Sequence, residues 1–143
     1  MPDLRTHALR LLARRDYSRA ELRTRLAPRA ESAEQLESLL ENLEASQLLS
    51  DHRYARQRVV SRSPRLGNAR LRQELKASGV DEEAIAAALP EAGDEVERCR
   101  AVWSRKFGVV PGGAEERARQ QRFLQYRGFS ADAIRRALAG GED

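Results

Sequence analysis

The feature that most constrains this chain is a repeat of apolar positions at an interval of 49 residues. Gly79 and Gly128 show the same spacing. Self-similarity at a fixed period is typical of a repeat architecture, so we expect three copies of one unit, at 1–49, 50–91 and 92–143. The apolar sets are Leu26, Leu75 and Leu124; Leu36, Ile85 and Ile134; and Leu40, Leu89 and Leu138.

Each unit is predicted to contain three helices. Ser18 and Ser32 are each followed three residues later by Glu or Gln, the pattern of a capping box at a helix start. Gly79 and Gly128 suit the left-handed position just after a helix. Tyr54 and Trp103 fall on apolar faces, so we expect both in the core.

Composition favours the same fold class. The 143 residues include 22 Ala and 18 Leu but seven Val and two Ile. Straight-chain residues favour helices, and scarce β-branched residues argue against a sheet. The sequence therefore predicts an all-α protein, an elongated and curved array of three tandem three-helix repeats.

Charge alternates in blocks along the chain. Net charge is +5 over 1–30, −5 over 31–49, +6 over 50–80, −7 over 81–97 and +7 over 98–139. One interpretation is a basic surface for phosphates and an acidic surface for a basic protein. The alternative is that neighbouring helices of opposite sign pair with each other. The bases are 24 Arg and two Lys, which fits either phosphate binding or codon bias.

Basic residues recur at helical spacing on the predicted first and second helices. Arg58, Arg62 and Arg65 share one face if their helix extends that far. A surface that follows a phosphate backbone needs a distributed set of this kind. The candidates are Arg14, Arg15, Arg19, Arg23, Arg58, Arg62, Arg65, Arg70, Arg72, Lys76, Arg105, Lys106, Arg119, Arg122 and Arg127. The candidates for facing a basic partner are Glu34, Glu37, Glu41, Glu82 and Glu83.

No motif predicts an enzyme, a metal site or a cofactor. Cys99 is the single cysteine, so we expect a small buried apolar side chain and a reducing, cytoplasmic setting. His7 and His52 have no Cys or His at metal-ligand spacing. No apolar run approaches the length of a membrane span, and the N-terminus lacks the apolar stretch of a signal peptide.

Four segments resemble the RecX family. They are SRAELRTRL at 18–26, LSDHRYAR at 49–56, Gly67 followed by RLRQEL at 70–75, and RFLQYRGFS at 122–130. Their order and spacing together are specific, and the family is built from tandem three-helix repeats. Two segments depart from the regular repeat: residues 27–35, which do not match the later units, and the turn at 109–113, which lengthens the third unit.

The resemblance implies a non-catalytic regulator of the RecA recombinase. Such proteins bind RecA and its nucleoprotein filament, lie along the filament groove and usually inhibit, which affects recombination, DNA repair and the SOS response. Some bind DNA, so the backbone of single- or double-stranded DNA is a further expected contact. We expect a monomer. The alternatives are a free-standing binder of nucleic-acid backbone, or a helical adaptor for another protein.

Overall fold

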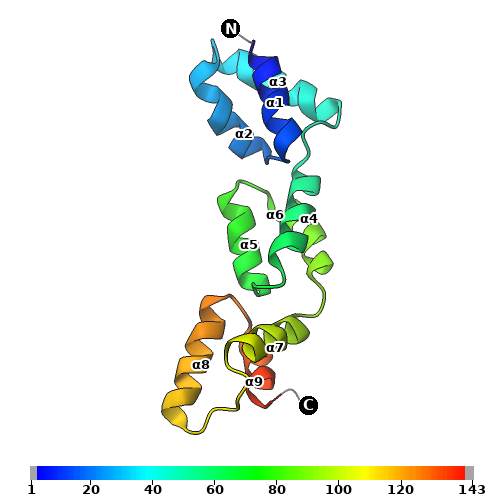
Figure 1. The fold of residues 1–143 in the computed structure, drawn as a ribbon. Helices are drawn as coiled ribbons and strands as arrows, with labels where there is room; N and C mark the ends of the chain where they lie inside the picture. Colours follow the sequence, from blue (N-terminus) through cyan, green and yellow to red (C-terminus); the bar gives the residue numbers. More distant parts are fainter. Residues whose placement is uncertain (1–2, 141–143) are drawn as a thin grey trace.

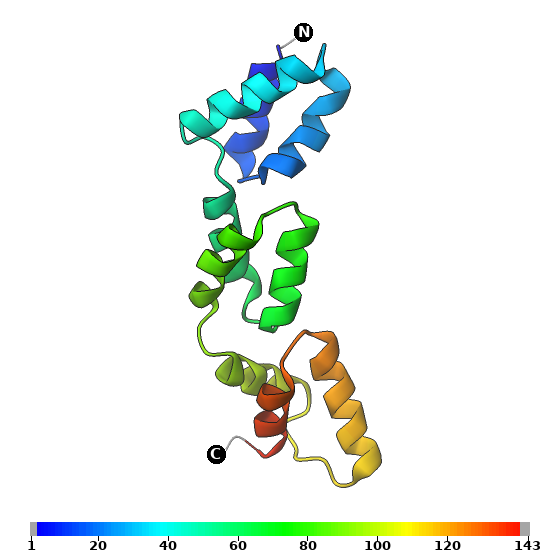
Figure 2. The ribbon, with the colours of Figure 1, turned by 180° about the vertical axis from the view of Figure 1, so that it is seen from behind.

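A computed structural model describes residues 3–140, and in this part of the chain every regular element is helical. The helices form an elongated, gently curved column of three units stacked end to end, with the chain termini at opposite ends (Figures 1 and 2). The second helices, α2, α5 and α8, lie along one edge of this column in both views. The elements are α1 (Leu4–Arg14), α2 (Arg19–Leu26), η1 (Ala27–Arg29), α3 (Ala33–Ala45), α4 (Asp51–Arg62), α5 (Asn68–Ala77), α6 (Glu82–Ala88), η2 (Leu89–Ala92), α7 (Glu95–Lys106), α8 (Ala114–Tyr126) and α9 (Ala131–Leu138).

Side-chain caps fix where most helices begin. The Ser18 side chain accepts from the amide of Glu21, and the Glu21 carboxylate accepts from the amide of Ser18, so the predicted capping box of α2 is complete. At α3, Ser32 accepts from the amide of Gln35 as predicted. The Gln35 side chain, however, accepts from Glu31 instead of Ser32, so this box is only half formed.

Glycines and prolines mark the helix ends. Gly79 (φ 83°) and Gly128 (φ 90°) occupy the predicted left-handed positions after α5 and α8. Pro28 and Pro90 each lie in a short 3₁₀ turn that follows α2 and α6. Proline is tolerated there because the first residues of such a turn need no amide donor.

Each unit has its own hydrophobic core, drawn from residues 4–49, 54–92 and 99–138. Tyr54 and Trp103 are both buried, as predicted. Cys99 is fully buried in the third core, and burial raises the pKa of its thiol to about 12. The thiol is therefore protonated near neutral pH and packs as a small apolar side chain.

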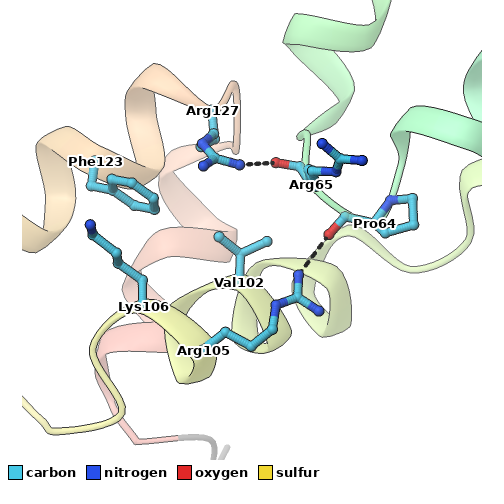
Figure 3. Close-up of a pocket in the computed structure, with 7 residues that line it drawn as sticks. All are labelled: Pro64, Arg65, Val102, Arg105, Lys106, Phe123 and Arg127. Atoms are coloured by element: carbon cyan, nitrogen blue, oxygen red, sulfur yellow. Dashed lines mark hydrogen bonds between the residues drawn. The ribbon is translucent and has the colours of Figure 1, made fainter.

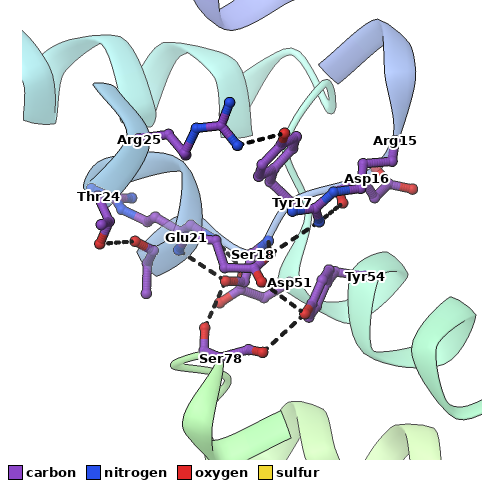
Figure 4. A network of polar contacts seen from close by, with 12 residues as sticks. Arg15, Asp16, Tyr17, Ser18, Glu21, Thr24, Arg25, Asp51, Tyr54 and Ser78 are labelled. Carbon is purple, nitrogen blue, oxygen red and sulfur yellow. Dashed lines mark hydrogen bonds and ion pairs between the residues drawn. The ribbon is translucent and has the colours of Figure 1, made fainter. Parts of the chain in front are cut away.

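The first of the two joints between units involves the N-terminus of α2 (Figure 4). The Ser18 hydroxyl donates to the carbonyl of Ser78, the residue that ends α5, at 2.6 Å. The amide of Arg19 donates to the carboxylate of Asp51, in the first turn of α4, at 2.7 Å. Tyr54 Oη lies 2.9 Å from Ser78 Oγ and 3.2 Å from Glu21 Oε2. Unit two therefore supplies acceptors for amide and hydroxyl groups at the start of a helix in unit one.

The second joint repeats this arrangement 49 residues later. The amide of Gly67 donates to the carbonyl of Arg127, the residue that ends α8, at 2.8 Å. The amide of Asn68 donates to Glu95, in the first turn of α7, at 2.8 Å. Arg98 also crosses the joint, donating to the carbonyls of Ser63 and Leu66 and to Asn68 Oδ1. Desolvation at this position lowers the pKa of the Arg98 guanidinium.

Close approach at both joints requires glycine. A Cβ on Gly79 would overlap the Cβ of Ala20, and a Cβ on Gly128 would overlap the Cβ and amide of Arg70. Gly93 also has a positive φ (77°), but no atom lies within 4 Å of its Cβ position. The first two glycines are therefore constrained by packing as well as by φ.

We expect Gly128→Ala to destabilise the protein more than Gly93→Ala. Both substitutions place alanine at positive φ, at a cost of about 1 kcal/mol, and the first adds overlap with α5. Urea unfolding followed by far-ultraviolet circular dichroism should show a loss of more than about 2 kcal/mol for Gly128→Ala. Equal losses in the two variants would mean that the joint relaxes without cost.

Candidate basic interface

The basic residues predicted to contact a partner are spread over all three units. Seven of them belong to α2, α5 and α8, the helices that lie along one edge of the column (Figure 1). This group comprises Arg19, Arg23, Arg70, Arg72, Lys76, Arg119 and Arg122. The others lie on α1, α4 and α7 or in the turns between helices.

Several of these bases are neutralised within the protein. Glu37 on α3 accepts from Arg23 at 2.7 and 3.0 Å and from Arg19 at 3.1 Å. Arg19 also pairs with Glu44. These hydrogen bonds, that from Arg23 first, lower the pKa of Glu37 to about 2. The alternative of pairing between neighbouring helices therefore accounts for part of the charge alternation.

The second and third units contain further internal pairs. Arg62 donates to both oxygens of Glu74, at 3.2 and 3.0 Å, and Arg72 pairs with Glu82. Arg119 pairs with Glu116 at 2.8 Å and lowers the pKa of that carboxyl.

Other bases rest on aromatic rings or backbone oxygens. Arg15 lies 3.7 Å from the ring centroid of Tyr17 and pairs with Glu21 at 3.3 Å. Arg70 donates to the carbonyl of Tyr126 at 2.8 Å and lies 5.0 Å from the centroid of its ring.

A smaller set of candidates remains without an internal partner. Within residues 3–140 the side chains of Arg14, Arg58, Arg65, Lys76 and Arg122 make no hydrogen bond or ion pair, and all five are exposed. Of the acidic candidates, Glu34 and Glu41 are likewise exposed and without a partner in this range, whereas Glu83 lies 3.7 Å from His52. The five bases, together with Glu34 and Glu41, are therefore available to an external partner without the loss of an internal pair.

The expected common face of Arg58, Arg62 and Arg65 does not form, because α4 ends at Arg62. The following turn contains Pro64, which cannot donate the amide hydrogen bond that a continuing helix needs. Arg62 is held by Glu74, Arg58 stays on the exposed side of α4, and Arg65 lies beyond the helix at the second joint.

Arg65 lines a groove of about 430 Å³ between the second and third units (Figure 3). Arg105 donates to the carbonyl of Pro64 at 3.2 Å, and Arg127 donates to the carbonyl of Arg65 at 3.3 Å. Lys106 and Arg127 lie 5.2 and 4.9 Å from the ring centroid of Phe123. The lining residues are Pro64, Arg65, Val102, Arg105, Lys106, Phe123 and Arg127.

Four of the predicted bases therefore meet at one place, although they are distant in the sequence. No binding motif in the sequence pointed to Pro64, Val102 or Phe123 as part of this site. Phe123 is only half-buried. The sequence did contain one signal for Phe123. The residue 49 positions earlier is Glu74, so the repeat has an aromatic side chain here in place of a charged one.

In the described part of the chain, no group of three or more His, Cys, Asp or Glu side chains is placed to hold a metal ion. No helix between residues 3 and 140 is long and apolar enough to cross a membrane.

Comparison with known proteins decides the family. The models of the second and third three-helix domains of RecX match residues 50–89 and 93–138. The chain is 47% identical to the regulatory protein RecX of Chromobacterium violaceum, over 98% of this chain and 91% of that protein. The chain belongs to the RecX family. It is also 44% identical to the regulatory protein RecX of Herminiimonas arsenicoxydans, over 98% and 93% of the two chains.

A solved RecX structure shows the same fold. The crystal structure of RecX from Lactobacillus salivarius superposes with a TM-score of 0.85, covering 96% of this chain and 94% of that one, at 19% sequence identity. The RecX fold of stacked three-helix units is thus retained where four residues in five differ.

The lowered pKa of Glu37 predicts a pH-dependent contribution to stability. Its folded-state value of about 2 lies below the ordinary 4.5, so its ion pairs stabilise the protein fully above the ordinary value and are lost as the pH falls towards 2. We expect the urea midpoint of Glu37→Gln to lie below that of the parent at neutral pH, and the difference to shrink below about pH 5.

Glu41→Gln is the control, because Glu41 is an exposed carboxylate in the middle of the same helix without a partner in residues 3–140. Its midpoint should follow that of the parent protein at every pH. A difference in urea midpoint between Glu37→Gln and the parent that stays constant down to the lowest pH would contradict the lowered pKa of Glu37.

Proposed function

We propose that this protein is a non-catalytic regulator, mainly an inhibitor, of the RecA recombinase. It binds along the groove of the RecA–DNA filament and so modulates recombination and DNA repair, including the SOS response. The observation that carries the proposal is membership of the RecX family, whose relatives are named regulatory proteins.

The arrangement of unpaired bases supports a contact made at several points. Arg14 lies at the end of α1, Arg58 on α4, Lys76 on α5 and Arg122 on α8, so exposed charges occur in each unit of the column. Each exposed charge contributes little alone. Linked contacts on one column raise the overall affinity because each bound point increases the effective concentration of the next.

Inhibition in this proposal is steric. A column held at several points in the groove blocks filament growth, strand exchange and access of a repressor to the filament. The unpaired bases meet DNA phosphates or acidic filament surface, and Glu34 and Glu41 meet basic patches on RecA or face solvent. No catalytic group or cofactor is required.

The proposal predicts that charge reversal at unpaired bases weakens inhibition of RecA. We expect Arg58→Glu/Arg122→Glu to raise the concentration needed for half-maximal inhibition of RecA ATP hydrolysis on single-stranded DNA by about tenfold. Arg5→Glu/Arg10→Glu is the matched control, since it makes the same charge change on exposed residues of α1 outside the predicted set. It should change this concentration by less than about twofold.

Two results would contradict the proposal. One is failure of the parent protein to be retained on preformed RecA–single-strand filaments at low salt. The other is tight DNA binding without RecA that falls steeply with salt while ATP hydrolysis by RecA is unaffected, which is the behaviour of a free-standing nucleic-acid binder. We expect Glu34→Lys/Glu41→Lys to change the concentration for half-maximal inhibition less than Arg58→Glu/Arg122→Glu does, because in this proposal the unpaired bases make the main contact with the filament.

A further inference from the structure

The two joints have a similar architecture but differ in their charged residues. The 49-residue period relates Asp16 to Arg65 and Glu74 to Phe123. At the first joint Asp16 accepts from Arg53 at 3.0 Å, and within the second unit Glu74 accepts from Arg62 at 3.2 and 3.0 Å. The groove at this joint is lined by Glu21 as well as by Arg25 and Lys76.

The second joint has lost both of these carboxylates. Arg65 stands where Asp16 would be and Phe123 where Glu74 would be. Arg105 matches Arg62 when VWSR at 102–105 is aligned with VVSR at 59–62, and it donates to the carbonyl of Pro64. No carboxylate lies among the residues that line the groove. The side chains of Arg65 and Lys106 make no hydrogen bond or ion pair within residues 3–140, so their charges are available for a ligand.

The lining selects the chemistry of that ligand. Val102 and Phe123 form an apolar floor next to Pro64. The side chains of Arg105, Lys106 and Arg127 lie around it, and that of Arg65 extends outward at the rim (Figure 3). Burial of an apolar side chain on this floor stabilises a complex, and arginine pairs with carboxylates through two parallel hydrogen bonds. The occupant should therefore carry both an apolar side chain and anionic groups.

A nucleobase fits this groove less well than a peptide. Two cations already lie over the ring of Phe123, and Phe107 packs against it edge to face with centroids 5.5 Å apart. A base stacked on Phe123 would have to displace one of these cations, whereas an aliphatic or aromatic side chain on Val102 would not.

We propose that the groove at the second joint binds an acidic peptide segment with an apolar anchor. The anchor side chain lies on Val102 beside Phe123, and the flanking carboxylates pair with Arg65, Arg105 and Lys106. Arg127 stays bound to the carbonyl of Arg65 and belongs to the frame of the groove. This inference rests on the proposed function only for the identity of the protein that carries the segment.

The test uses the full chain and a fluorescein-labelled hexapeptide, a Leu-Phe pair with two acidic residues on each side. Fluorescence anisotropy is measured without RecA and without DNA. We expect Arg65→Glu/Lys106→Glu to weaken binding at least about tenfold. Arg14→Glu/Arg58→Glu makes the same charge change on exposed, unpaired residues away from the groove and should stay within about twofold.

Two further probes separate the groove from general charge attraction. A hexapeptide with Ala-Ala in place of Leu-Phe should bind at least about tenfold more weakly, because the anchor is lost. An oligothymidylate should not displace the acidic hexapeptide at equal concentration. Circular dichroism melts check that the variants fold, and Arg65→Gln/Lys106→Gln replaces the reversed pair if that pair unfolds.

Three outcomes would overturn the inference. They are no binding of the hexapeptide at low salt, equal weakening by the two charge-reversal pairs, and displacement of the hexapeptide by the oligothymidylate. Because the assay contains neither RecA nor DNA, its result is independent of the ATP hydrolysis assay. Peptide binding without inhibition of RecA would refute the proposed function and leave the groove assignment standing.

Discussion

The arrangement of the column depends on one interaction, the completion of a helix N-terminus by the next unit. The first amides of a helix have no partner inside it, and at α2 and α5 acceptors come from the following unit. The carbonyl of Ser78 or Arg127 receives one bond, and the carboxylate of Asp51 or Glu95 receives the other. Each joint is therefore fixed by directional hydrogen bonds, which define the angle between units more sharply than apolar contact alone.

Charge has two separate roles in this molecule. Part of it holds neighbouring helices together, as where Glu37 binds Arg19 and Arg23. The rest remains on exposed side chains at intervals along the column. These internal pairs lie at least partly in solvent, so each contributes modestly to stability. The main consequence of these internal pairs is that only the remaining bases are available to a partner.

Repetition of the unit provides an internal comparison that a single domain lacks. Both joints bury equivalent backbone contacts, yet one has carboxylates where the other has Arg65 and Phe123. Stacking does not require this difference, because at both joints a carbonyl and a carboxylate of the following unit accept hydrogen bonds from the start of a helix. Each joint has a groove, but Glu21 lines the first, whereas no carboxylate lines the second.

The sequence by itself determined the three units, their helices and most of the helix ends. Caps such as Ser18 and stops such as Gly128 act within a few residues, and the apolar period repeats the same core positions, so local signals are sufficient. The tertiary structure decided which bases are neutralised and where Arg65 lies. Those outcomes depend on distances between side chains far apart in the sequence, which no local pattern specifies.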